Sequence, residues 1–234
     1  GLAVNARDWV TQNINHGVVD LATLEMNGAL KPDKSFTIHN MGGKLAFRDT
    51  EVTYMPHMPV ATKVKGVATY DAANFNIILT TGDVLQSKLT AADIRISALD
   101  QHTQQIDMLL DTNGPLQNVI KIIESQPLEY PQKMGHKSEQ FSGNIKTKLY
   151  LGFPLLHALK LDEVRMKAAG TITDATIKNV VRDVTATGDR MVVKVDPDSL
   201  LLAGRVKLND AINDVIWREF FNNKNPNATQ VDLK

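Results

Sequence analysis

The stretch that decides the fold is GGKLAFRDTEVTYMPHMPV, residues 42–60. Leu45 and Phe47 alternate with polar or small neighbours, as expected for a β-strand, in which successive side chains point to opposite faces. Residues 49–51 then intervene, and Val52 and Tyr54 resume the alternation on the opposite parity. This odd shift predicts a β-bulge over 49–51, because one inserted residue returns the later apolar side chains to the original face.

The same period of two continues through most of the chain, with turn signals such as DAAN, TTGD, ATGD and DPDS between several runs. Each run has one apolar face, so the sequence predicts a mainly β protein with long antiparallel strands. The apolar positions expected to share that face are Leu45, Phe47, Val52, Tyr54, Val64, Ala68, Tyr70, Phe75, Ile77, Leu79, Ile94, Ile96, Ile106, Met108, Leu110, Leu149, Leu151, Phe153, Val193, Val195, Leu200 and Leu202.

Only two helices are expected. The first spans 3–14, where Asn5 is a candidate N-cap. The second spans 115–124, because proline is favoured in the first turn of a helix and apolar residues follow at i, i+3, i+4 and i+7. The segment VIWREFF, 215–221, fits either a helix or a strand, and its β-rich surroundings favour a strand.

Composition excludes some classes of function. The 234 residues carry 26 Lys plus Arg and 26 Asp plus Glu, so the formal net charge is zero and nothing favours nucleic acid, whose binding requires neutralised phosphates. The absence of cysteine excludes disulfides and thiolate metal sites. No run approaches the roughly 20 apolar residues of a membrane helix. The chain begins at Gly1, and we expect 1–234 to be a single segment of a longer protein.

The long strands constrain the architecture. About a dozen strands at about 4.8 Å spacing make a sheet on the order of 55 Å wide, and two helices of about 15 Å cannot cover its apolar face. We therefore expect the sheet to curl over itself as a barrel, a sandwich or an open groove. The Val, Ile, Leu, Met and Ala lining suits a flexible hydrocarbon, but the same alternation is typical of an ordinary packed core.

A search for catalytic or metal-binding patterns gives no site. The six histidines form no H-x-H or HExxH spacing, and no serine lies in a G-x-S-x-G motif that would complement Asp100 and His102. Asp196 and Asp198 lack the glycine and distant glutamate of a calcium loop. We therefore expect no catalytic residues, no metal and no cofactor.

Several segments of the sequence, taken in order, resemble those of a known protein family. ARDWVTQNINHG at 6–17 is similar to the helix that opens the central region of AsmA-like bacterial envelope proteins, closest to the YhdP-type branch. TNGPLQNVIKIIESQPLEY at 112–130 also resembles that family, and so does the sequence from Trp217 to Phe220. Further matching positions are Gly43, Phe47, Asp49, Val52, Tyr54, Pro59, Gly66, Gly143, Phe153, Pro154 and Leu155.

The resemblance implies a strongly curled, taco-like β-sheet around an apolar groove, in the periplasmic part of an inner-membrane-anchored protein that carries phospholipids between the inner and outer membranes. The apolar positions named above would then line the lipid path. The implied partners are phospholipid acyl chains, the remaining segments of the same longer chain, and membranes at the ends of the full-length protein. The alternatives are an envelope scaffold with a packed β core and no ligand, or an enzyme of unrecognised type.

Overall fold

The computed structural model describes residue 8 and residues 11–54, 57–125, 136–156, 159–160, 163–221 and 229–234. Within these residues one antiparallel sheet of thirteen strands contains nearly all the regular structure. Its strands are β1 (Ile14–Asn15), β2 (Val18–Leu30), β3 (Phe36–Val52), β4 (Ala61–Asp71), β5 (Phe75–Val84), β6 (Ser87–Ser97), β7 (Gln105–Pro115), β8 (Phe141–Pro154), β9 (Arg165–Val181), β10 (Val184–Val195), β11 (Ser199–Leu208), β12 (Ala211–Phe220) and β13 (Thr229–Leu233).

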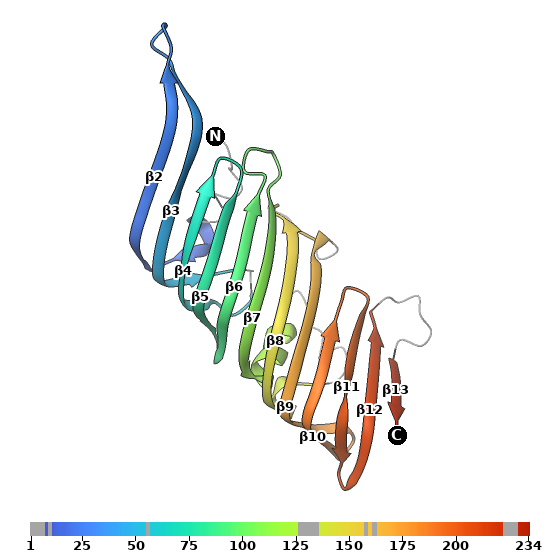
Figure 1. The fold of residues 1–234 in the computed structure, drawn as a ribbon. Coiled ribbons are helices and arrows are strands. Elements are labelled where there is room, and N and C mark those ends of the chain that lie inside the picture. The colour runs from blue at the N-terminus through green and yellow to red at the C-terminus, as the bar shows by residue number, and fades with distance from the viewer. Residues whose placement is uncertain are drawn as a thin grey trace.

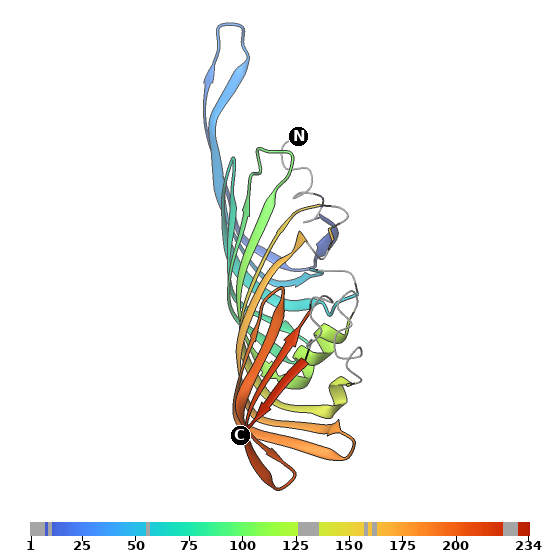
Figure 2. The same ribbon diagram turned by 90° about the vertical axis from the view of Figure 1, so that its right-hand side faces the viewer.

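The strands follow one another across the sheet in chain order, from β3 to β13 (Figure 1). Both β1 and β2 pair with β3 and form one edge, and β13 forms the other, so the sheet does not close. Seen from the side, the sheet is strongly curved, with one concave and one convex face (Figure 2). The predicted class, a curled antiparallel β-sheet with few helices, is confirmed.

The predicted helix at 115–124 is confirmed as α2 (Leu116–Glu124), with Pro115 at its N-cap. It lies on the concave side of the sheet (Figure 2), and a single turn of 3₁₀ helix, η1 (Ser138–Gln140), precedes β8. The segment 215–220 is a strand, as expected, because its pairing with β11 uses every residue of β12.

The predicted helix at 3–14 lies largely outside the described residues. Residue 8 and residues 11–13 are helical, but Ile14 is not. Ile14 opposes Val52 in β1, so the expected end of this helix was one residue too far along. The apolar side chain of Ile14 fits a helical stripe and a strand equally well, and strand pairing with β3 decides its conformation.

Two clusters of buried side chains lie on the concave face. The larger one joins Leu116 of α2 to Ile145, Ile172 and Met191 on β8, β9 and β10. The smaller one is built from Ile96, Ile106 and Leu155, with Phe75 and Phe153 beside it. The clusters occupy opposite ends of the strands, because Ile145 lies near the start of β8 and Phe153 near its end.

The predicted bulge is present in β3. Phe47 opposes Gly66 and Thr50 opposes Val64, so β3 has one residue more than β4 between these pairs. Asp49 lies in the bulge and has a positive φ of 55°. Phe47 and Val52 therefore face the same side. Thr50 faces it too and is 5% exposed, which corrects the expectation that residues 49–51 all interrupt the pattern. Because Thr50 is polar, the alternation of apolar residues could not show that it faces inward.

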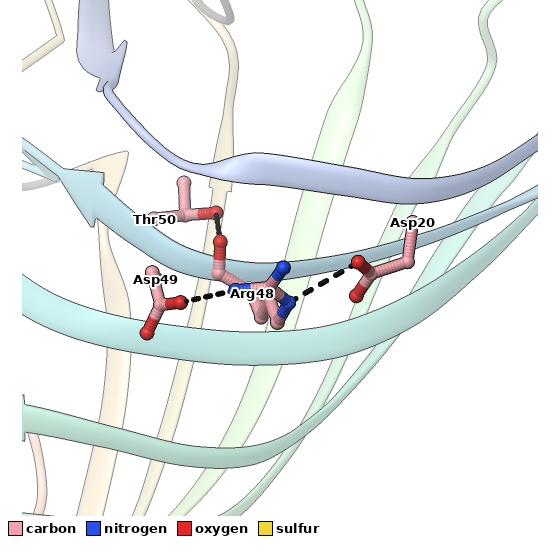
Figure 3. Close-up of polar contacts among 4 residues, drawn as sticks. All are labelled: Asp20, Arg48, Asp49 and Thr50. Atoms are coloured by element: carbon pink, nitrogen blue, oxygen red, sulfur yellow. Dashed lines mark hydrogen bonds and ion pairs between the residues drawn. The ribbon is translucent and has the colours of Figure 1, made fainter.

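Polar contacts on the opposite side hold this bulge (Figure 3). The guanidinium of Arg48 lies 2.8 Å from the Asp49 carboxylate and 3.1 Å from that of Asp20. Asp20 is the extra residue of β2, since Val19 and Leu21 oppose consecutive residues of β3. Hydrogen bonding to Asp49, together with the charge of Asp20, raises the pKa of Arg48 above its usual value. Arg48 thus links irregularities in both strands.

A candidate apolar trough

Cross-strand register arranges the concave face in rows that run across the sheet, perpendicular to the strands. Each residue of a row directly opposes the next, so all side chains of a row share one face. The central row consists of Val19, Phe47, Gly66, Leu79, Ala92, Leu110, Leu149, Ala168, Val195 and Leu200. At about 4.8 Å between strands, this row is about 43 Å long.

Two parallel rows lie beside the central row on the same face. One consists of Leu45, Ala68, Ile77, Ile94, Met108, Leu151 and Met166. The next consists of Gly43, Tyr70, Phe75, Ile96, Ile106 and Phe153. Toward the other ends of the strands, Thr147, Gly170, Val193 and Leu202 form part of a further row, in which threonine and glycine replace apolar side chains.

These rows contain almost every apolar position named from the sequence. Val52 and Val64 lie beside the bulge on the same face, and Tyr54 follows the end of β3. None of these positions is exposed: Val64, Ala68, Ile96 and Ile106 are buried and the others are half-buried. Whether they contact lipid stays a prediction.

The central row differs from the two clusters in its packing. None of its members belongs to the cluster under α2 or to the cluster around Leu155. The large side chains of this row, such as Leu79, Leu110 and Leu149, are half-buried, and Leu149 on β8 lies between the two clusters. We call the half-buried central row, together with the row through Leu151, the trough.

Glycines in these rows make room for aromatic rings. A Cβ at Gly66 would lie 2.5 Å from the Ile78 carbonyl oxygen and 3.2 Å from Cζ of Phe47. A Cβ at Gly43 would lie 2.5 Å from Oη of Tyr70, whose hydroxyl donates to the Thr23 carbonyl at 2.8 Å. The rings of Phe47 and Tyr70 therefore occupy the space that a side chain at these glycines would need.

The surroundings of Tyr54 are also weakly polar. Burial raises the pKa of its phenol to about 12, because desolvation disfavours the phenolate. Thr147 has a buried hydroxyl oxygen without a hydrogen-bond partner. The carboxylate of Glu219, opposite Leu200, accepts hydrogen bonds of 3.4 Å from Nε1 of Trp217 and 2.6 Å from the Thr229 hydroxyl.

The convex face carries charged and polar side chains in pairs, together with exposed apolar residues such as Val67, Ile78 and Leu109. Arg165 lies 3.2 Å from Asp107, which also accepts a hydrogen bond of 2.6 Å from the Tyr150 hydroxyl. A shallow hollow of about 570 Å³ is lined by residues such as Asp111, Lys146 and Lys194. These charges are exposed to water, so each pair contributes little to stability.

Among the residues described above, no group of three or more His, Cys, Asp or Glu side chains is placed to hold a metal ion. In the same part of the chain, no helix has the length and apolar character needed to cross a membrane.

Comparison with known proteins identifies the family. The family described as YhdP protein matches residues 1–181, which is more than half of the chain. No curated protein and no solved structure matches the chain. The chain therefore belongs to the YhdP family, a family of AsmA-like bacterial envelope proteins, as its sequence features indicated.

Proposed function

We propose that this member of the YhdP family is a non-enzymatic segment of a lipid conduit. The acyl chains of phospholipids lie in the trough, along the rows and across the strands, and their head groups remain in water at the open side of the curved sheet. In the full-length protein this segment lies in the periplasm, between an anchor in the inner membrane and the outer membrane.

The half-buried central row carries this proposal. In a packed core, large side chains such as Leu79, Leu110 and Leu149 would be almost fully buried, because protein interiors are packed at crystal-like density. Here they stay partly accessible while Leu116 and Ile145, one margin away, are 4% exposed. A flexible hydrocarbon would complete the burial of such a surface, and about 25 cal/mol per Å2 of covered apolar area would favour its binding.

The uniform chemistry of the row suits movement along it. As far as Leu200, Phe, Leu, Ala, Val and Gly follow one another without a charged member, and Glu219 comes next on β12. Neighbouring sites of the apolar part therefore bind hydrocarbon with similar free energies. Similar sites keep the barriers between them low, and lipid would move passively along this segment. Any input of energy would have to come from another part of the full-length protein.

An envelope scaffold with a packed β core is the second candidate. The cluster under α2 favours it, because Val119 and Ile120 of this helix pack against a buried cluster whose side chains come from β8 to β11. If the same kind of packing extended over the central row, no lipid would have room. The two candidates therefore differ in what covers Leu149 and Leu151.

Photo-crosslinking combined with mass spectrometry tests this difference. A photoreactive amino acid at Leu151 should form adducts with phospholipids when the protein is expressed in a bacterial envelope. The matched control is Leu109, which lies on the adjoining strand but on the convex face and is 59% exposed. Lipid adducts at 151 and not at 109 support the conduit. Adducts at neither position, together with no lipid in the purified protein, support the scaffold.

A further inference from the structure

The hairpin of β2 and β3 extends beyond the rest of the sheet (Figure 1). The last residue of β3 that pairs with β4 is Gly42, so residues 36–41 have β2 as their only neighbour in the sheet. We call residues 24–41, with the turn at 31–35, the arm. A two-stranded ribbon without further packing is marginally stable in water, so a partner that covers the arm would stabilise it.

One face of the arm is apolar and exposed. Its cross-strand pairs on that face include Met26 with Met41 and Leu30 with Phe36. Leu30 is 71% exposed and Phe36 is 58% exposed, and the same face carries Leu24, Met26, Ile38 and Met41. This face continues that of the trough, because Leu45 and Gly43 lie on the same side of β3 and lead directly to Met41.

The reverse face of the arm is polar. It carries Glu25 and Asn27 on β2, and Thr37 and Asn40 on β3. The arm is therefore an amphipathic ribbon, with apolar side chains on one side and polar side chains on the other. A β-strand added at the free edge of β2 would pair with its backbone but would leave the apolar face uncovered. The face needs a partner that lies over it.

The turn of the arm has a net charge of +1, from Lys31 and Lys34 against Asp33. Lys31 and Lys34 flank Asp33, whose carboxylate accepts hydrogen bonds from the backbone N–H of Ser35 at 2.9 Å and from its hydroxyl at 2.6 Å. No ion pair of either lysine is found in the described parts of the chain. Two free ammonium groups thus stand beside Leu30 and Phe36, the most exposed apolar pair of the arm.

From these observations we propose that the arm docks on the surface of an anionic phospholipid bilayer. The apolar face, from Leu24 to Met41, enters the boundary between head groups and acyl chains, and the lysines of the turn contact phosphate groups. The arm lies in the interface and does not span the bilayer, because the free edge of β2 needs hydrogen bonds from water or head groups. This inference stands on the arm alone and does not require that the trough carries lipid.

Vesicle flotation with the purified chain tests the proposal. We expect binding to vesicles of phosphatidylcholine with added phosphatidylglycerol and weaker binding to phosphatidylcholine alone. The double variant Leu30→Ser/Phe36→Ser should bind at least about tenfold less, because it removes two large apolar side chains. Lys31→Gln/Lys34→Gln should lose binding only to the anionic vesicles, at about fivefold for each lysine.

The matched control is Val67→Ser/Ile78→Ser. These residues are also a directly opposed pair, but they lie on the convex face and are 50% and 45% exposed. Their replacement should leave vesicle binding unchanged. Equal losses in both double variants, or no binding of the parent chain to either kind of vesicle, would overturn the proposal.

An environment-sensitive fluorophore gives a second measurement, because the chain has no cysteine of its own. The emission of a label at Ile38→Cys, on the apolar face, should shift to shorter wavelength with anionic vesicles, and that of a label at Asn40→Cys, on the polar face, should shift much less.

The arm would instead cover a second copy of this chain if the emission of the label at 38 shifts without vesicles and the mass doubles as the concentration rises. That result would overturn bilayer docking. Vesicle binding by a protein that retains no lipid would leave this inference intact and contradict the conduit.

Discussion

The substitution Leu151→Asp separates an open trough from a packed core. Leu151 is half-buried, opposes Met108 on one side and Met166 on the other, and belongs to neither buried cluster. Full burial of a leucine contributes about 1.5–3 kcal/mol. A half-buried one contributes about half of that, and a new carboxylate in an open trough can stay hydrated. We therefore expect a loss of about 1–2 kcal/mol in the free energy of unfolding.

The comparison is with Ile172→Asp, in the cluster under α2. Ile172 is 6% exposed, so the carboxylate would be buried without a partner or would have to take up a proton. Either outcome costs several kcal/mol. Leu109→Asp, on the convex face, should change stability by less than about 0.5 kcal/mol.

Urea unfolding followed by circular dichroism, together with mass spectrometry of retained lipid, measures both effects. The proposed function predicts that Leu151→Asp remains folded and retains less lipid, since an anion on the lining repels hydrocarbon. The full-length protein with this change should then fail to complement a transport-deficient strain. A loss of stability as large as that of Ile172→Asp, with no lipid in parent or variant, would refute the reasoning and favour the scaffold. Normal folding, normal lipid content and normal complementation would mean that Leu151 does not line the path.

Three further changes test the local physics. Deletion of Asp49 removes the extra residue of the bulge, so Thr50 should still oppose Val64 on the concave face and the unfolding free energy should fall by no more than about 1 kcal/mol, and Asp49→Gly should be tolerated because its φ of 55° suits glycine. A fall in the urea midpoint for the deletion that matches the burial of two misplaced side chains, about 3 kcal/mol or more, would contradict the register. Gly66→Ala should destabilise the fold by about 1–3 kcal/mol through overpacking against Phe47 and the neighbouring backbone, whereas Gly82→Ala, with its nearest atoms at 3.4 Å, should cost much less in the same assay. Burial raises the pKa of Tyr54 in the folded protein to about 12, so its contribution to the free energy of unfolding should be complete below about pH 10 and should fall by at most about 2 kcal/mol as the pH rises toward 12. The melting temperature of Tyr54→Phe should decline less steeply than that of the parent over this pH range, and equal slopes would disprove the burial of the phenol.

Alternation in the sequence was enough to predict the strands, the bulge in β3 and the shared face of the apolar positions. It failed where inward positions are small or polar. On β9, Ala168 and Gly170 face inward and Asp174 has a positive φ of 52°, so the pattern could be followed only to 168 although the strand extends to 181. Small side chains carry little hydrophobic signal, and cross-strand pairing extends the strand without it.

Exposure could not be predicted, because a trough and a packed core require the same alternation. What separates them is the curvature of the sheet and the place where α2 lies. The stripe of α2 predicted a helix with one apolar face, but the position of that face over Ile145, Ile172 and Met191 follows from the register of three strands. The arm was missed for a related reason: nothing in the sequence of β3 indicates that pairing with β4 stops at Gly42.

Under the proposed function, the two buried clusters determine the direction in which lipid can move. A hydrocarbon chain lying parallel to the strands would meet Leu155 and its neighbours at one end and α2 at the other. A chain lying across the strands would follow the central row, where Gly66, Ala92 and Ala168 separate larger side chains and the first charged residue is Glu219, opposite Leu200. Each step of about 4.8 Å brings it from one strand to the next. The clusters therefore border the row on β5 to β11 and leave the direction across the strands open, from the β2 edge as far as Leu200 on β11, because Glu219 of β12 opposes Leu200.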